Sequence, residues 1–373
     1  MRMPDISHAT GCKNTYLNPR LKMHKDVTIY DIAKGVGVSP TTVSRALNDH
    51  PAVNKKTKQR ISEKAAQLGY RSNLFASNLR RQRTHTIGVI VPLLNSSFQS
   101  SVMAGMEKVA TAAGYNLIIT QSMGTVGKEV ANAKTMYNSR VDGLLVSLAH
   151  DTGNIDHFEP FFRKGIPVLF YDRVAEHKQS TSIIIDNVQA AYKATTHLIE
   201  QGCRNIAHIT GNLKVNVYAH RLKGYKYALI DHNLPFRESM VITNGLTEED
   251  GIKAAAEILD MKPRPDGIFV SNDFCAVNCM KALKQAGVAV PGDIAMVGFN
   301  NDPIARVVEP SLTTINYPGY EMGEVAMRSL INYLDAVSDN SIANTVTLRA
   351  ELIVRESSLK MKPEKQLAGA LSL

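Results

Sequence analysis

From Thr86 to about residue 300, short apolar runs alternate with segments whose apolar residues have helical spacing. The first runs are TIGVIVPLL (86–94), YNLIITQS (115–122) and DGLLVSLA (142–149). This alternation is typical of a parallel sheet with helices on both faces. Runs rich in Ile, Val and Leu suit strands that are buried on both sides. We therefore predict an α/β fold for this part of the chain.

The same pattern occurs twice along the chain. RVDGLLVS (140–147) reappears as RPDGIFVS (264–271), and VLFYD (168–172) has a counterpart in AMVGFN (295–300). Two similar α/β lobes in tandem predict a cleft between them, with ligand-binding groups on the loops that follow the carboxyl ends of the strands. We expect the functional chemistry of this part of the chain in that cleft.

Positive charge is concentrated in the first quarter of the chain. Residues 1–85 contain 16 Lys and Arg and 5 Asp and Glu, a net charge of +11, whereas the other 288 residues contain 27 basic and 29 acidic ones. A basic segment joined to a near-neutral body is typical of a module that binds a polyanion, although a solvated tail is the alternative. The four cysteines show no C-x-x-C spacing, so we expect neither a metal site nor a disulfide scaffold.

Between Thr28 and Tyr70 the sequence predicts three short helices. Thr28 is a candidate cap of a first helix that ends at Gly37, and Ser39 precedes Pro40 at the start of a second. The third helix is expected from about Lys55 to Leu68. Two short helices joined by a glycine-containing turn form a helix-turn-helix, whose second helix enters the major groove of DNA. The alternative is a three-helix bundle with no ligand.

The run VTIYDIAKGVGVSPTTVSRALN (27–48), with the lysine-rich helix ending in LGY, resembles the head of the LacI/GalR family of bacterial transcription regulators. The resemblance continues to about Ser358 and includes LTTINYP (312–318) and LRAELIVRESS (348–358). It implies a three-helix head, a hinge helix and a two-lobed body like the periplasmic sugar-binding proteins. It also implies a homodimer that binds near-palindromic double-stranded operator DNA and responds to a small-molecule effector.

The resemblance also implies boundaries between the parts of the chain. Residues 1–26 are expected to be a disordered extension, 27–72 the DNA-binding domain, 73–85 the hinge helix and linker, 86–358 the effector-binding and dimerisation domain, and 359–373 a tail. The first lobe is expected to contain 86–184 and 318–344, and the second 185–317 and 345–358.

By the same resemblance, the DNA contacts lie on the head and the hinge. The residues implied are Thr28, Ser39, Pro40, Thr41, Thr42, Ser44, Arg45 and Asn48 in the head, and Asn73, Ala76 and Leu79 in the hinge. Hydroxyl and guanidinium groups on an exposed helix suit base edges and phosphates. Leu79 matches a wedge that enters the minor groove when the hinge folds on DNA, and an ordinary polar linker is the alternative.

The resemblance places the effector contacts at six positions of the body. These are Phe98, Ser147, Asp172, Arg221, Asn272 and Asp273. An aromatic face, a guanidinium and carboxylates that each accept two hydroxyls fit a polyol, so we expect a carbohydrate or a derivative of one. Val215 and Val217 replace an arginine and a threonine of purine-binding members, which argues against a purine. Leu246 replaces an aromatic residue that commonly stacks on the ligand.

Two other classes of protein were considered. An enzyme on an α/β scaffold is not supported, because the sequence contains no G-x-G-x-x-G, G-x-x-x-x-G-K-[ST], H-E-x-x-H or G-x-S-x-G motif. His208, His220 and Asp172 could in principle assemble into a catalytic group, but histidines are more often surface or core residues, and no cofactor is implied. A solute-binding protein would require export, and the first 26 residues contain no apolar segment of a signal peptide. With no apolar stretch long enough to span a membrane, we expect a cytoplasmic protein.

Overall fold

The computed structural model describes residues 27–70, 83–335 and 344–360. The chain divides into two compact units, Met1–Ser77 and Asn78–Leu373. The first contains the three-helix head and the second contains the body. The hinge expected at 73–79 lies outside the described residues.

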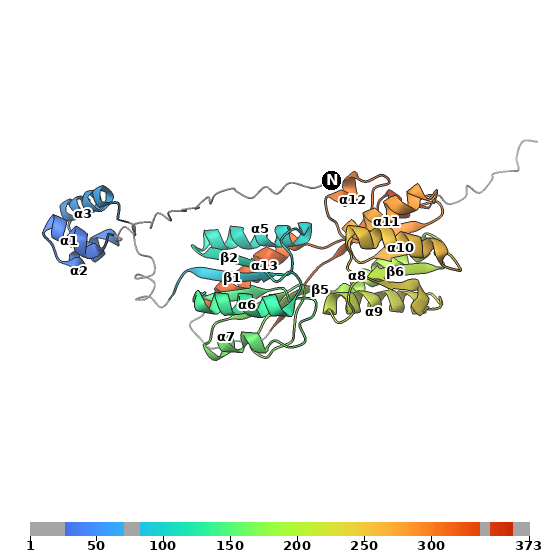
Figure 1. Ribbon diagram of the computed structural model, residues 1–373, viewed down its shortest axis with the longest axis horizontal. Coiled ribbons are helices and arrows are strands. Elements are labelled where there is room, and N and C mark those ends of the chain that lie inside the picture. Colours follow the sequence, from blue (N-terminus) through green and yellow to red (C-terminus); the bar gives the residue numbers. More distant parts are fainter. Residues whose placement is uncertain (1–26, 71–82, 336–343, 361–373) are drawn as a thin grey trace, which may run out of the picture. The chain divides into compact units, whose positions relative to one another are not determined.

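The head consists of α1 (Ile29–Val36), α2 (Pro40–Leu47) and α3 (Lys55–Leu68) (Figure 1). The helix bounds agree with the prediction. Gly37 ends α1 with a φ of +74°, a left-handed conformation that glycine adopts without steric cost. The Ser39 side chain caps α2 by accepting a hydrogen bond from the backbone N–H of Thr42 at 3.1 Å.

The core of the head is small and aliphatic. Its buried residues are Ile32, Ala33, Val43, Ala46, Val53, Ile61 and Ala65. Leu47, which the helical spacing places on the apolar side of α2, remains 39% exposed. It is the last residue of α2 and lies outside the buried cluster, so the core of α2 rests on Val43 and Ala46.

The first sheet of the body has the strand order β11-β5-β4-β3-β1-β2. Its strands are β1 (Thr86–Val91), β2 (Asn116–Gln121), β3 (Gly143–Val146), β4 (Val168–Tyr171), β5 (Ser182–Ile185) and β11 (Thr345–Leu348). These strands pair in parallel throughout the described residues. Helices α5 (Ser97–Ala112) and α13 (Gly319–Asp335) cover one face, and α6 (Val126–Asn138) and α7 (Glu159–Arg163) cover the other (Figure 1).

The second sheet repeats this plan with the order β12-β10-β9-β8-β6-β7. Its strands are β6 (Ile206–Thr210), β7 (Val241–Thr243), β8 (Gly267–Val270), β9 (Ala295–Asn300), β10 (Thr313–Asn316) and β12 (Glu351–Ile353). The edge strand β12 runs antiparallel to β10, and the other described pairs are parallel. The helices are α8 (Asn187–Glu200) with α9 (Asn216–Asp231), α10 (Glu248–Asp260) with α11 (Asp273–Gln285), and the short α12 (Ile304–Val307).

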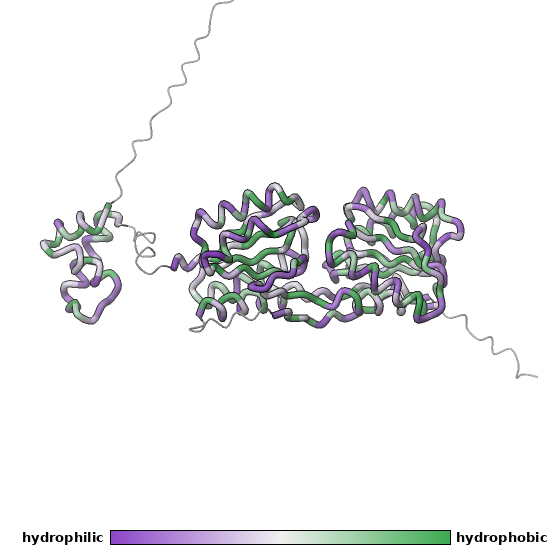
Figure 2. The backbone as a smooth tube through the Cα atoms, turned by 90° about the horizontal axis from the view of Figure 1, so that it is seen from below, coloured by the Kyte–Doolittle hydropathy of each residue, from purple (hydrophilic) through white to green (hydrophobic). Residues whose placement is uncertain are grey.

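Both sheets are apolar inside, as the runs of Ile, Val and Leu predict. Figure 2 shows hydrophobic strands in each lobe enclosed by helices of mixed hydropathy. The strands β3, β4 and β8 are buried along their whole length. This agrees with strands that are covered by helices on both faces, and the predicted two-lobed α/β fold is confirmed.

Within the described residues the chain passes between the two sheets three times. The passages connect β5 to α8, β10 to α13 and β11 to β12. The last passage was expected at 344–345, which is wrong, because β11 pairs in parallel with β5 in the first sheet, with Thr345 opposite Ser182. The passage therefore lies between Leu348 and Glu351. The edge of β5 is completed by a strand that follows it by about 160 residues, a pairing that local sequence does not specify.

Glycines allow the helices of the body to pack backbone against backbone. A Cβ atom at Gly323 of α13 would lie 1.9 Å from the carbonyl oxygen of Val102 in α5, and one at Gly105 of α5 would lie 2.1 Å from that of Tyr320. The pair α8 and α9 has the same arrangement at Gly224. The helix pairs α5/α13 and α8/α9 therefore pack more closely than a larger residue at these glycine positions would permit.

We expect Gly323→Ala to destabilise the body, because the added methyl group has no space beside the α5 backbone. The cost of such overpacking is about 1–3 kcal/mol, which lowers the melting temperature by at least about 2 °C. Gly127→Ala in α6 is the matched control, because a Cβ there meets nothing within 4 Å. Thermal unfolding of the full chain followed by circular dichroism measures both. Equal melting temperatures for the two variants would contradict the close packing.

Candidate functional site

A cavity of about 670 Å³ lies between the two lobes of the body. Of the six predicted effector residues, four line it, namely Phe98, Asp172, Arg221 and Asn272. Ser147 and Asp273 are fully buried and are not among its lining residues. The cavity has the size of a small-molecule site, since such sites are usually about 300–1,000 Å³.

Asp172 is the centre of a hydrogen-bonded cluster at the carboxyl end of β4. Its Oδ1 accepts a hydrogen bond from the Tyr317 hydroxyl at 2.8 Å. Its Oδ2 accepts from Gln99 Nε2 at 3.4 Å and from the Ser147 hydroxyl at 3.3 Å. Ser147 therefore orients Asp172 from behind the cavity. Asp172 has a φ of +59°, a conformation that Asp adopts more readily than most residues and that is often found at functional sites.

Arg221 projects from α9 and is only 3% exposed. Its Nε donates to Asn187 Oδ1 at 2.9 Å, and its Nη1 donates to the carbonyl oxygen of Ser271 at 2.7 Å. Its guanidinium carbon lies 3.5 Å from the centre of the Phe299 ring, which stacks against it. Burial lowers the pKa of this guanidinium, which nevertheless remains charged at neutral pH. Its hydrogen bonds and the stacked ring fix its plane.

The second-lobe residues Asn272 and Asp273 have structural partners. Asn272 caps α11 by accepting from the backbone N–H of Cys275 at 2.7 Å. Asp273 accepts from the Thr314 hydroxyl at 2.6 Å and from the backbone N–H of Asp302 at 2.8 Å. Since Asp302 lines the cavity and Asp273 does not, Asp273 supports the cavity wall. The expectation that it contacts the effector directly is not met by this geometry.

Several residues that line the cavity were not predicted. They include Gln99, His150, Arg173, Tyr218, Asp302 and Tyr317. Arg173 directly follows the predicted Asp172, and Tyr317 lies in the stretch LTTINYP, so their positions beside strand ends were available as a signal. Burial, followed by the charge of Arg173, lowers the pKa of His150 to about 4, so this ring is neutral at neutral pH. Leu246 and Val217 also line the cavity.

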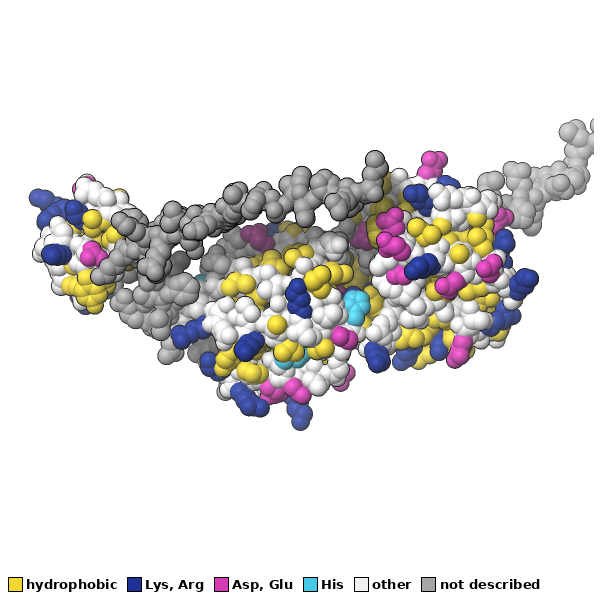
Figure 3. Space-filling model, viewed as in Figure 1, with side chains coloured by type: hydrophobic (Ala, Val, Ile, Leu, Met, Phe, Trp, Pro, Cys, Tyr) yellow, Lys and Arg dark blue, Asp and Glu magenta, His cyan; other side chains and the backbone are white. Residues whose placement is uncertain are grey.

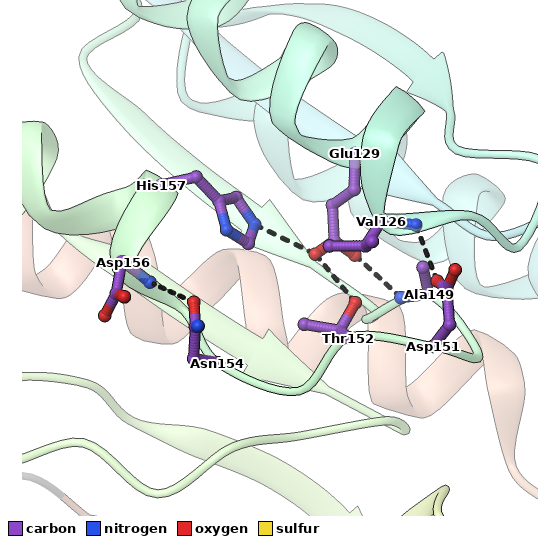
Figure 4. A network of polar contacts seen from close by, with 8 residues as sticks. All are labelled: Val126, Glu129, Ala149, Asp151, Thr152, Asn154, Asp156 and His157. Carbon is purple, nitrogen blue, oxygen red and sulfur yellow. Dashed lines mark hydrogen bonds and ion pairs between the residues drawn. The ribbon is translucent and has the colours of Figure 1, made fainter.

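A buried carboxylate fixes the loop that carries His150 (Figure 4). Glu129 of α6 accepts hydrogen bonds from the backbone N–H of Ala149 at 2.7 Å and from the Thr152 hydroxyl at 3.0 Å. His157 Nε2 lies 2.9 Å from Glu129 Oε1. A buried carboxylate with several donors rigidifies its surroundings. The sequence contains no signal for this role, since Glu129 looks like an ordinary helical acid.

Apart from Thr28, which caps α1, the predicted DNA contacts of the head lie on α2 or at its two ends. Val43 and Ala46 are buried in the core, whereas Thr41, Arg45 and Asn48 are exposed. Figure 3 shows Lys and Arg side chains on the surface of the head. The remaining predicted residues are exposed (Thr28, Ser39) or half-buried (Pro40, Thr42, Ser44). Asn73, Ala76 and Leu79 lie outside the described residues. The head therefore presents a polar and basic helix face to solvent.

The three residues considered for catalysis do not come together. His208 is fully buried in the second lobe between the rings of Phe269 and Tyr225, His220 is exposed, and Asp172 lies at the cavity. In the described ranges no group of three His, Cys, Asp or Glu side chains could hold a metal ion. None of the helices in those ranges is both long enough and apolar enough to cross a membrane.

We predict that Asp273 makes a pH-dependent contribution to stability. Burial raises its pKa to about 7 from the ordinary 3.8. Its contribution to the free energy of unfolding is therefore complete below about pH 4 and is lost as the pH rises through about 7. Asp273→Asn cannot titrate, so the melting temperature of the wild type minus that of the variant should fall between about pH 4 and about pH 7 and level off above that range.

The exposed Asp156→Asn variant is the control for the removal of one carboxyl group. Titrating groups that do not interact with Asp273 are common to both proteins and cancel in the comparison, whereas Asp302 and Arg355 interact with it electrostatically. A difference for Asp273→Asn that is independent of pH would show that this carboxyl group ionises normally.

Comparisons with known proteins match the head and part of the body to known domain families. Residues 28–73 match the model of bacterial regulatory proteins of the lacI family, and residues 195–358 match the periplasmic binding protein-like domain. The chain is 35% identical to catabolite control protein A of Priestia megaterium over 85% of this chain and 96% of that protein.

Two solved structures are similar along most of the chain. The transcriptional regulator CelR in a complex with cellobiose aligns with a TM-score of 0.68 and 26% identity, over 89% of this chain and 99% of that one. A lac repressor dimer bound to operator and the anti-inducer ONPF aligns with a TM-score of 0.79, over 90% of this chain and 100% of that one. Because the two sequences are 24% identical, this comparison shows a similarity of fold alone.

Proposed function

Because the chain belongs to the lacI family of bacterial regulatory proteins, we propose that it is a transcriptional repressor whose affinity for operator DNA is controlled by a carbohydrate effector. One observation supports this proposal above all: the same chain has a helix in the head with an exposed polar side, and a polar cavity between the two lobes of the body. The first site suits a nucleic acid and the second a small molecule. A regulator needs both.

The DNA side of the proposal rests on the head. The net charge of +11 over residues 1–85 attracts the phosphate backbone, and exposed Thr41 and Arg45 can reach base edges or phosphates. A two-fold symmetric dimer would bind a near-palindromic operator. Because the proposed partner is operator DNA on the bacterial chromosome, we place the protein in the cytoplasm.

The effector side rests on the cavity. Its aromatic residues Phe98, Tyr218 and Tyr317 offer apolar ring faces, and Asp172, Asn272 and Arg221 offer acceptors and donors for hydroxyl groups. The similar CelR structure contains cellobiose, which supports a carbohydrate. We assign no catalytic role to these residues, and the protein in this proposal is not an enzyme.

In the proposed mechanism the effector bridges the lobes. It contacts Asp172 in the first lobe and Arg221 and Asn272 in the second, so its binding changes the angle between the lobes. The hinge at 73–79 would then be biased towards or away from its DNA-bound form. A coupling free energy of roughly 1–3 kcal/mol gives a change in operator affinity of about 5- to 150-fold.

We expect Arg45→Gln to reduce the salt dependence of DNA binding. Each lost contact between a cation and a phosphate lowers the slope of log affinity against log salt concentration by about one. Fluorescence anisotropy with an operator selected from random DNA by the full-length protein measures the slope. Arg163→Gln, an 80% exposed arginine of α7 in the body, is the matched control. Unchanged slopes for both variants would exclude Arg45 from the DNA surface.

We expect Asp172→Asn to separate the two activities. The variant should bind the operator with wild-type affinity and lose the response to the effector, since a hydroxyl bound to a carboxylate is held more strongly than one bound to an amide. Operator anisotropy with a panel of mono- and disaccharides tests this, with Asp156→Asn as the control. If no carbohydrate changes the operator affinity of the wild type, the proposed effector class is wrong.

A further inference from the structure

The segment after β3 contains a contact between the two lobes that lies away from the chain passages. The carbonyl oxygen of His150 in the first lobe accepts a hydrogen bond from Asn212 Nδ2 in the second lobe at 3.4 Å. Asn212 follows β6, which β8 and β9 separate from β10, whereas the passages use strands at the other edge of the sheet. The His150 ring also lines the cavity. The position of this one residue therefore affects both the cavity and the contact between the lobes.

Glu129 holds the backbone on both sides of His150 (Figure 4). Its side chain is fully buried in the first turn of α6. Its Oε2 accepts from the backbone N–H of Ala149 at 2.7 Å, and its Oε1 accepts from the Thr152 hydroxyl at 3.0 Å. His157 Nε2 lies 2.9 Å from the same Oε1. Because these groups share one carboxylate, its removal would leave them without their partner in a largely buried place.

A second attachment runs in the opposite direction, from the loop to the start of α6. Asp151 Oδ1 accepts from the backbone N–H of Val126, the first residue of α6, at 2.6 Å. The backbone N–H of His150 donates to the carbonyl oxygen of Gly124 at 3.1 Å. A Cβ atom at Gly124 would lie 2.8 Å from His150 Cδ2, so the ring packs directly on the glycine backbone. The helix and the loop therefore hold each other, with the His150 ring fixed between the glycine and the cavity.

The pKa of His150 depends on how firmly its ring is held. Burial, followed by the charge of Arg173, lowers this pKa to about 4, and the nearby Asp151 opposes the change. Both causes of the lowered pKa require the ring to stay buried beside Arg173. If the loop moved into water, the larger cause would be lost and the pKa would return towards the ordinary 6.5. In the position described, the neutral ring offers one donor and one acceptor to a ligand hydroxyl.

We propose that Glu129 is a positioning residue for the effector cavity: through the loop 149–152 it holds His150 where the ring lines the cavity and the carbonyl oxygen meets Asn212. The inference rests on the proposed effector-controlled repressor and adds to it a residue that does not contact the effector. Glu129 is not among the residues that line the cavity. It acts on the ligand through His150, as the supporting hydrogen bonds behind a binding site do.

The test follows the His150 ring by NMR in the full-length protein, with carbon-13 in the histidine rings. The signal is assigned as the one that disappears in His150→Gln. In the wild type it should not change between about pH 5.5 and about pH 8. Glu129→Leu, which removes every acceptor, should raise the pKa of His150 by at least about 1.5. Glu129→Gln keeps one carbonyl oxygen and should raise it less, and it provides the test if the leucine variant does not fold.

Two controls separate positioning from a general loss of stability. Met136→Ala removes a fully buried side chain of α6 that takes no part in the hydrogen bonds of the loop. It should lower the melting temperature and leave the His150 titration unchanged. Lys134→Gln removes an exposed charge from the same helix and should change neither.

A second measurement tests the effect on the cavity. Operator anisotropy with the panel of mono- and disaccharides gives the concentration at which each sugar has half of its effect. For a sugar that acts on the wild type, Glu129→Leu should raise this concentration at least about tenfold, whereas Met136→Ala should leave it unchanged.

The outcomes separate this inference from the proposed function. An unchanged His150 titration in both Glu129 variants would show that the loop keeps its place without the carboxylate, and the inference would be wrong. An equal change in Met136→Ala would also overturn it, as would a wild-type response to sugar in Glu129→Leu. If no carbohydrate alters the operator affinity of the wild type, the proposed effector class fails, and the titration alone decides whether Glu129 positions His150.

Discussion

The cavity depends on one buried carboxylate, that of Asp172. A carboxylate in a largely dry site is stable only when several donors point at it, and here the donors come from α5, the end of β3 and the segment after β10. Tyr317 belongs to a segment that joins the lobes. The hydrogen bond between Asp172 and Tyr317 therefore connects the first lobe to the segment between the lobes. It also fixes the Tyr317 ring, against which Phe98 packs with ring centres 4.3 Å apart.

Much of the fold could be predicted because its signals are local. The caps at Thr28 and Ser39, the glycine at Gly37 and the apolar runs of the strands act within a few residues of where they stand. The predicted position of the third passage between the lobes was wrong by a few residues. The reason is that β11 pairs with β5, a strand far away in the sequence, and local sequence does not show which of the two sheets a strand will join.

The candidate site was predicted less completely than the fold. The family resemblance implied Asp172 and Asn272, which line the cavity, but whether a side chain faces the cavity or its supporting layer depends on packing. Ser147 and Asp273 belong to that supporting layer, as does Glu129, which no motif indicates. Arg173 was next to a predicted residue, yet that its side chain lines the cavity becomes apparent only from the packing around it.

The three chain passages between the lobes limit how the body can move. Two lobes joined by a single segment can reorient freely. Here three segments, after β5, β10 and β11, connect the lobes, so bending about the line through these segments is the motion that costs the least free energy. In the proposed mechanism, a ligand that contacts both Asp172 and Arg221 acts on one side of this line. The chain enters the first lobe just before Thr86, at the amino end of β1, whereas the cavity lies beyond the carboxyl ends of β1 and β4. A rotation of the first lobe about this line would therefore also displace the point at which the chain arrives from the head.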